Sequence, residues 1–316
     1  MKELVSILIP AHNAEQWLKE TIKSVMSQTW ENIEIIMVDD GSIDNSLEIA
    51  RSFASDKVKV IRQENAGAAA ARNRAFEASK GGFIQYLDAD DLLAPNKIEQ
   101  QMLRLHQESN KTIASGPFFE FTNAIDKGSV KPDEGYKDYE KPLDWLVNAA
   151  LDKAMFPPLV WLTPRKLVDA AGPWNEQLSY NDDPEFFARV LLKADKIVFC
   201  PEAKSYYRRG IATSLGSRKD SRAVESWLRS LMLVSKYIMQ EEDSNRTREA
   251  CAYQYRKFIY SHYPMYLQLR NEAQKEIEKL GVHGVYDFGR NNTAKLNKIF
   301  GWKTIKWLRH LYYKLN

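Results

Sequence analysis

Two kinds of apolar pattern alternate along the first hundred residues. Short, nearly continuous apolar runs occur at residues 4–9, 33–38, 57–61 and 82–87. The segments between them are Ala-rich or place apolar residues three or four positions apart, at residues 14–28, 45–54 and 66–79. Short runs predict buried strands, whereas helical spacing predicts helices. Because the two alternate, we predict an α/β fold with a mostly parallel, Rossmann-like sheet that helices cover on both faces.

Polar residues follow three of these predicted strands. His12 and Asn13 come after the first strand, the turn 39–42 after the second, and the acidic stretch 88–91 after the fourth. Right-handed connections place the carboxyl ends of parallel strands along one edge, where ligands of such sheets bind. We therefore predict that the three polar groups converge on one crevice.

The later part of the chain has a different pattern. Residues 113–121 are predicted to form paired strands, and residues 128–142 a mobile loop. Two helices are predicted at 143–151 and 183–194, and a strand at 196–200. After about residue 220 only helical patterns occur. We predict two parts, an α/β domain at 1–218 and an all-helical C-terminal region at 219–316.

The composition narrows the class of protein. A net charge of +3 over 316 residues does not indicate a nucleic-acid-binding protein. Cys200 and Cys251 are far apart and lack metal-site spacing, which favours a reduced, cytoplasmic compartment. Residues 4–10 do not form a signal peptide, and no apolar run approaches the length of a membrane span. We expect a soluble protein or one that lies on the inner face of a membrane.

An acidic cluster ends the fourth predicted strand. Asp88, Asp90 and Asp91 repel one another, and a buried carboxylate without a partner is costly. A divalent cation such as Mg²⁺ or Mn²⁺, shared with the phosphates of a substrate, would compensate this charge. The alternative is a solvated acidic loop at the start of a helix. The position of the cluster at the edge of a parallel sheet favours the metal.

Three further segments carry side chains that could bind a ligand or take part in catalysis. Asp39 or Asp40 could accept hydrogen bonds from a base or ribose, or could only form a turn. Arg72 lies near the start of an Ala-rich helix, either reaching a phosphate or base or exposed to solvent. Asp182 or Asp183 could cap a helix with Pro184 at its first position, which leaves one carboxylate for proton abstraction.

Together these segments resemble the family 2 glycosyltransferases. These enzymes have the GT-A fold and transfer a sugar from a nucleotide-sugar donor with inversion of configuration at the anomeric carbon. The matching stretches are SILIPAHNAEQWL, EIIMVDDGSIDNS, ENAGAAAARN, GFIQYLDADD, YNDDPEFFARV and YYRRGIATSL. They occur in the expected order and cover about residues 3–215, so the helical region lies outside the resemblance.

The resemblance implies a donor site for a UDP-sugar with Mn²⁺ or Mg²⁺. Asp40 matches the residue that reads the uracil ring, Asp88 the ribose-side position and Asp90 the metal ligand. Arg208, with Ser214, matches a loop that folds over the diphosphate. Many relatives have an aromatic residue at the position of His12. The remaining implied nucleotide contacts are Pro10, Ala11, His12, Asn13, Glu15, Asn65, Gly67, Arg72 and Ala89.

The resemblance also implies an acceptor site and a mechanism. Asp183 matches the catalytic base, which takes the proton of the acceptor hydroxyl as that oxygen attacks the anomeric carbon. The implied acceptor side consists of Asp91, Trp161, Trp174 and Asp182, with Asp91 near either the acceptor or the metal. The implied acceptor is a glycan, a glycoprotein or a lipid-linked molecule in bacterial surface polysaccharide assembly, and the implied reaction is of the hexosyltransferase type.

Two departures narrow the resemblance. The transmembrane helices and Gln-x-x-Arg-Trp motif of polymer synthases are absent from the sequence, which favours single sugar additions. A sugar-phosphate nucleotidyltransferase would have a Gly-rich, Arg-containing loop after its first strand, where this chain has IPAHNAE. A catalytically silent nucleotide-sugar-binding protein is the third class, and the presence of all the expected carboxylates weighs against it.

The C-terminal end is basic and amphipathic. Residues 290–316 contain seven Lys or Arg and no Asp or Glu. One face of a predicted helix holds Trp302, Ile305, Leu308, Tyr312 and Leu315. The pattern is typical of a helix at an anionic membrane surface, but also fits one that packs on its own core or forms a homodimer.

Overall fold

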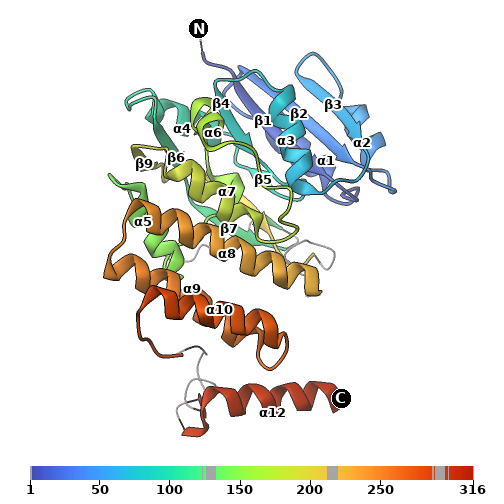
Figure 1. Ribbon diagram of the computed structural model, residues 1–316. Helices are drawn as coiled ribbons and strands as arrows, with labels where there is room; N and C mark the ends of the chain where they lie inside the picture. Colours follow the sequence, from blue (N-terminus) through green and yellow to red (C-terminus); the bar gives the residue numbers. More distant parts are fainter. Residues whose placement is uncertain are drawn as a thin grey trace.

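The computed structural model describes residues 2–122, 124–125, 133–211, 220–286, 288, 296–297 and 299–315, and of residues 313–315 it describes the backbone alone. A five-stranded sheet lies at its centre, in the order β3-β2-β1-β4-β8 (Figure 1). The strands are β1 Val5–Ala11, β2 Ile33–Asp40, β3 Val58–Gln63, β4 Phe83–Tyr86 and β8 Thr163–Pro164. All neighbours are parallel except β4 and β8, which confirms the predicted α/β fold.

The connections between these strands are the predicted helices. They are α1 Leu18–Met26, α2 Ser46–Ser52 and α3 Ala68–Ala78. The chain runs from β1 out to β3 and then returns to β4, so right-handed crossovers place α1 and α2 on one face and α3 on the other. The alanines of α3 let it pack closely on β1 and β2, and this close packing sets the position of Arg72.

Two small sheets extend the edge of the main sheet. One has the order β5-β10-β7, and the other pairs β6 with β9. The bounds are β5 Leu92–Leu93, β6 Thr112–Ser115, β7 Phe118–Phe121, β9 Lys196–Phe199 and β10 Ser205–Arg208. The prediction that residues 113–121 form paired strands is wrong in its pairing, because β6 and β7 join different sheets. Gly116 lies at the switch, where a Cβ would come within 2.2 Å of the Ala203 carbonyl oxygen.

Helices surround these sheets, in the middle part of the chain and after residue 220. In the middle part they are α4 Lys97–Leu105, α5 Pro142–Ala150, the short 3₁₀ helix η2 Pro158–Val160, α6 Arg165–Ala171 and α7 Asp182–Leu191. The C-terminal part consists of α8 Ser221–Glu241, α9 Asn245–His262, α10 Leu267–Leu280 and α12 Trp302–Leu315. Apart from these helices, the described residues after 220 form no strand, as predicted.

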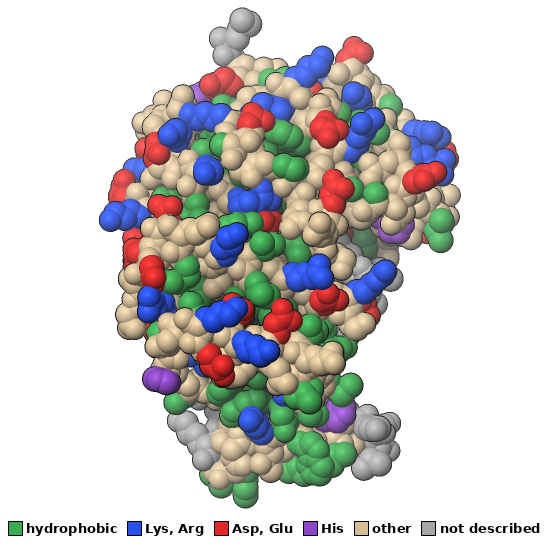
Figure 2. Space-filling model, in the orientation of Figure 1, with side chains coloured by type: hydrophobic (Ala, Val, Ile, Leu, Met, Phe, Trp, Pro, Cys, Tyr) green, Lys and Arg blue, Asp and Glu red, His purple; other side chains and the backbone are tan. Residues whose placement is uncertain are grey.

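The C-terminal helices stack below the α/β part (Figure 1). Asp220 caps α8 by accepting a hydrogen bond from the Ala223 amide at 3.0 Å. α8 packs on α7, and α9 packs on α8, α5 and α10. Basic and acidic side chains are mixed over much of the face shown in Figure 2. No helix among the described residues is both long and apolar enough to cross a bilayer.

Candidate active site

Three loops meet at the carboxyl edge of β1, β2 and β3. His12 Nδ1 donates to the carbonyl oxygen of Asp40 at 2.8 Å, and the side-chain amide of Asn65 donates to the same oxygen at 3.1 Å. The carboxylate of Asp40 accepts hydrogen bonds from the amides of Ala66 and Gly67, both at 2.9 Å. The first two of the three predicted polar groups therefore meet, since the Asn13 amide also donates to Ser42 Oγ at 3.0 Å. Asn65 and Gly67 join them from the loop before α3.

Glycine is required where these loops touch. Gly41 has a φ of +69°, and a Cβ there would lie 2.8 Å from the backbone nitrogen of Asn65.

Glu15 connects the first loop to the start of α2, since its carboxylate accepts from the backbone amide of Asn45 at 3.0 Å and from the Asn45 side chain at 2.7 Å. Pro10 and Ala11 are the last residues of β1 and are buried behind this surface.

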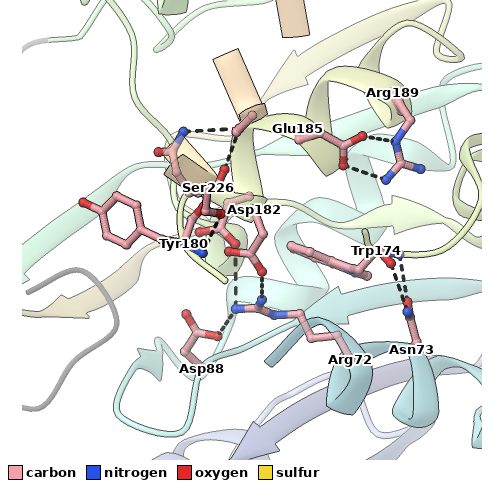
Figure 3. Close-up of polar contacts among 12 residues, drawn as sticks. Arg72, Asn73, Asp88, Trp174, Tyr180, Asp182, Glu185, Arg189 and Ser226 are labelled. Carbon is pink, nitrogen blue, oxygen red and sulfur yellow. Dashed lines mark hydrogen bonds and ion pairs between the residues drawn. The ribbon is translucent and has the colours of Figure 1, made fainter. Parts of the chain in front are cut away.

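Arg72 connects the acidic groups of two distant segments (Figure 3). Its guanidinium donates to Asp88 at 2.9 Å and to Asp182 at 2.7 Å, and it lies 3.7 Å from Asp183. The ring of Trp174 lies 4.4 Å from the guanidinium carbon. Only 4% of the Arg72 side chain is exposed, so this cation is held in the interior by carboxylates and an aromatic ring.

The electrostatics of this group follow from the contacts. Burial alone would lower the pKa of Arg72, but Asp88, Asp182 and Asp183 raise it well above its ordinary value. Burial raises the pKa of Asp183 well above that of a free carboxyl, Asp182 adds to the rise, and Arg72 opposes it. The Asp183 side chain is nevertheless 34% exposed. It is thus a carboxyl with a perturbed pKa that an incoming molecule can reach.

The structure places the Arg72 side chain among carboxylates, one of which is Asp88, the predicted ribose-side residue. The prediction that Asp182 or Asp183 caps α7 with Pro184 at its first position is wrong. The helix begins at Asp182, after Asn181 in a left-handed conformation. The Asp182 carboxylate is turned to Arg72, since a buried guanidinium competes more strongly for it than a backbone amide does.

The acidic tip after β4 brings like charges together, with Asp91 buried and Asp88 and Asp90 partly buried. Burial, together with the charge of Asp88, raises the pKa of Asp90 to about 6. Burial and the charges of Asp90 and Asp88 raise the pKa of Asp91 well above its ordinary value. Asp91 Oδ1 accepts from the Arg208 amide at 2.8 Å, whereas its Oδ2 is buried without a hydrogen-bond partner among the described residues. Ala89, between these carboxylates, is buried.

Arg208 lies at the end of β10, not on a loop as the resemblance implied. Its Nε donates to the Asp90 carbonyl at 2.9 Å and its Nη2 to Glu20 at 2.6 Å. The guanidinium lies between the rings of Trp17 and Phe121, at 4.3 and 4.4 Å. Because these contacts hold its side chain in place, Arg208 supports the acidic tip through its hydrogen bond to the Asp90 carbonyl. Ser214 lies outside the described residues.

The two predicted tryptophans are core residues. Trp161 is buried among Trp145, Phe156 and Phe187, so the structure places it away from any surface that an acceptor could touch. Trp174 is buried under Arg72 and stacks on Phe186, with ring centroids 4.0 Å apart. The resemblance assigned both to the acceptor side, but large aromatic rings are more often packing residues.

Three supporting residues were not anticipated from the sequence. Trp17, directly before α1, and Glu20 of α1 hold Arg208 in place. Asn73, beside Arg72, donates to the Trp174 carbonyl at 3.0 Å and accepts from its amide at 2.8 Å. An amide next to a buried arginine on an Ala-rich helix is a signal that could have identified Asn73. Among the described residues, no three His, Cys, Asp or Glu side chains form a metal site from protein ligands alone.

Comparisons with known proteins agree with this geometry. The family model described as glycosyl transferase family 2 matches residues 6–144. A glycosyltransferase of Streptococcus pneumoniae, GlyG, is 30% identical over 244 residues, which is 74% of this chain and 79% of that protein. An uncharacterised glycosyltransferase of Rickettsia typhi is 35% identical over 200 residues, 60% of this chain but only 58% of its own length.

The fold is also similar to a solved structure. The S. aureus TarS fragment 1–349 superposes with a TM-score of 0.68 over 89% of this chain and 81% of that one, at 18% identity. The expected GT-A fold is confirmed by this match, by the parallel sheet and by the C-terminal helices. With the family model and the similarity to the pneumococcal protein over about three quarters of each chain, these findings show that the chain belongs to glycosyltransferase family 2.

Proposed function

We propose that this protein is an inverting glycosyltransferase that moves a sugar from a UDP-sugar to an acceptor hydroxyl. The observation that carries the proposal is the position of Arg72, which gathers Asp88, Asp182 and Asp183 at the carboxyl edge of the sheet. S. aureus TarS, which has a similar fold, has been crystallised with UDP and with UDP-GlcNAc, and this supports a nucleotide-sugar donor.

The donor side is formed by the loops after β1, β2 and β3. His12, Asn13 and Asn65 present exposed polar groups next to the Asp40 carbonyl, which suits contact with a base and its ribose. Asp88 turns one carboxylate oxygen to Arg72 and is 31% exposed, so it remains reachable by a ribose hydroxyl.

A divalent metal fits the acidic tip. Asp90 supplies hard oxygen donors of the kind that Mg²⁺ and Mn²⁺ prefer. Burial and the neighbouring Asp88 charge raise the pKa of Asp90, and a nearby cation would oppose both effects. Asp90 would hold such an ion together with the donor diphosphate, so few protein ligands would be needed. When bound, the ion would stabilise negative charge on the leaving diphosphate.

The acceptor side is formed at the start of α7. Asp183 takes the proton of an acceptor hydroxyl while that oxygen forms a bond to the anomeric carbon and the bond to the diphosphate oxygen breaks with its electron pair. A base works best with a pKa near the working pH, and burial moves the pKa of Asp183 in that direction. Arg72 opposes this rise in the pKa of Asp183 and fixes Asp182 beside it.

The organisation of the whole chain is part of the proposal. We propose that residues 1–218 carry donor binding and catalysis and that 219–316 form a helical region that shapes the acceptor side. Hydrogen bonds from Ser226 and Ser230 of α8 to the backbone of Tyr180 and Asn181, directly before Asp182, support this role. Surface glycan assembly on the cytoplasmic side is the cellular setting that we propose.

The test is release of UDP from a panel of UDP-sugars, with Mn²⁺ or Mg²⁺, with and without sugar acceptors. We expect slow release with at least one donor, accelerated by an acceptor and abolished by a metal chelator. Release of pyrophosphate from a nucleoside triphosphate and a sugar phosphate, without UDP release, would contradict the proposal and indicate a nucleotidyltransferase.

A further inference from the structure

In the part of the chain that the structure describes, the ring contacts of the last helix with the rest of the protein lie in its first half. The Trp302 ring stacks on Tyr286, with centroids 4.8 Å apart, and contacts the rings of Tyr260 and Tyr263. Ile305 is buried, and the Lys306 ammonium lies 4.6 Å from the Tyr260 ring. These contacts use one face of the N-terminal half of α12.

Large apolar side chains lie outside these contacts. Trp307, Leu308 and Tyr312 are 48%, 51% and 64% exposed, and Ile299 and Phe300 just before the helix are also exposed. Figure 2 shows hydrophobic side chains gathered at the lower end of the molecule, where Figure 1 places α12. An apolar patch of this kind on a protein surface marks an interaction site.

The charge around the patch indicates the kind of partner. Residues 290–316 contain seven Lys or Arg and no acidic residue, and Lys303 and Arg309 are exposed on α12 itself. A second copy of the chain would bring one basic patch against another, which is repulsive. An anionic surface is complementary, and Trp and Tyr together with Lys and Arg are typical of helices at the lipid–water interface.

We propose that α12, with Ile299 and Phe300, docks on the surface of an anionic lipid bilayer. The 14-residue helix is about 20 Å long at 1.5 Å per residue, which is shorter than the roughly 30 Å hydrocarbon layer, so it lies in the plane of the interface. The apolar side chains enter the acyl boundary while the basic side chains contact lipid phosphates. The proposal is independent of the sugar-transfer activity.

The experiment is sedimentation of the full-length protein with vesicles. One set contains phosphatidylcholine alone and the other phosphatidylcholine with one third phosphatidylglycerol, each at low and high salt. We expect the protein to pellet with the anionic vesicles, and added salt to weaken this binding because it screens the basic side chains. Absence of pelleting with anionic vesicles would overturn the proposal.

Two double variants and two matched controls locate the contact. Trp307→Ser with Leu308→Ser, and separately Lys303→Glu with Arg309→Glu, should each weaken binding at least tenfold. The controls, Met26→Ser with Leu103→Ser and Arg51→Glu with Lys193→Glu, change exposed residues elsewhere and should bind like the native protein. Equal binding by all four would overturn the proposal.

Light scattering after gel filtration distinguishes the other occupant. If the native protein dimerises, and the Trp307→Ser, Leu308→Ser variant is monomeric and neither binds vesicles, the face belongs to a second copy and the lipid proposal is wrong. Unchanged thermal unfolding of the variants would show that lost binding is not lost folding.

Discussion

Arg72 of α3 and Asp182 of α7 are 110 positions apart in the chain and are joined by a 2.7 Å hydrogen bond. This ion pair places the first carboxylates of α7 beside the end of β4, where Asp88 accepts from the same guanidinium. The donor and acceptor sides of the proposed site are thus held by one side chain. The first prediction concerns that side chain.

Replacing Arg72 by alanine should destabilise the protein and abolish activity. The substitution leaves Asp88, Asp182 and Asp183 without their shared cation. Removing one partner of a buried ion pair costs about 3–5 kcal/mol, and we expect roughly 2–4 kcal/mol here because the carboxylates are partly exposed. Urea unfolding measures the cost. Arg74→Ala, on the exposed side of the same helix, is the control and should change stability by less than about 0.5 kcal/mol.

Replacing Asp183 by asparagine should abolish turnover and preserve binding of UDP. The amide keeps the shape of the carboxyl but cannot take the acceptor proton, and loss of a general base lowers kcat by about 10²–10⁴. Steady-state UDP release and calorimetric titration with UDP give the two quantities. A variant that retains native turnover would show that Asp183 is not the base.

The direction of the Asp183 pKa shift predicts how turnover depends on pH. Its pKa is raised in the folded protein, so the group becomes protonated at a higher pH than a free carboxyl does. Once protonated, it can no longer accept the proton of the acceptor hydroxyl. We expect kcat to fall as the pH decreases through this raised pKa. The measurement is the pH profile of kcat at saturating donor and acceptor. A constant kcat down to pH 4, below which a free aspartate is protonated, would contradict the assignment.

Lys97 should make the stability of the folded protein change with pH in the alkaline range. Its side chain is buried, donates to Gln85 Oε1, and has a pKa that burial lowers well below the ordinary value. The unfolded chain keeps this proton up to about pH 10.4, so between the two pKa values it binds more protons than the folded chain, and stability rises with pH. Urea unfolding between pH 7.5 and 10 should show this rise in the native protein and a smaller one in Lys97→Met. Lys193→Met, at an exposed site, should keep the native slope. Equal slopes in all three proteins would mean that Lys97 stays charged in the folded state.

Two neighbouring glycines provide a test of packing. A Cβ on Gly81 would lie 2.5 Å from Ser6 Oγ and 2.7 Å from the Ser6 nitrogen, whereas a Cβ on Gly82 meets nothing within 4 Å. Gly81→Ala should therefore cost about 1–3 kcal/mol of stability, and Gly82→Ala should be neutral or slightly stabilising. Thermal unfolding of the two variants compares them directly. Similar effects would mean that the first turn before β4 is looser than described.

The main sheet could be predicted from the sequence because its signal is local. Runs such as 33–38 are apolar apart from Glu34, which is close to what a strand buried on both faces requires. The convergence of His12 and Asp40 follows from the same rule, since parallel strands end at one edge. The GT-A fold rests on this order of elements, and the comparisons confirm it.

The contacts that hold the site together could not be predicted. Arg72 and Asp182 meet because α3 packs on β1 and β2 and because Phe186 of α7 packs on Tyr86 of β4. Neither position is encoded by nearby residues. The same holds for β6, whose partner β9 begins 84 positions after it at Lys196. Arg208 looked like a loop residue because the sequence does not show that Trp17 and Phe121 enclose its guanidinium.

The central claim is that the acidic tip after β4 binds a cation together with the diphosphate of the donor. Anomalous diffraction from crystals grown with UDP and Mn²⁺ tests it most directly. The account predicts a manganese peak beside the Asp90 carboxylate and the UDP phosphates, with the uracil ring near Asp40 and His12. UDP bound elsewhere, or ordered at the tip with manganese absent, would contradict it.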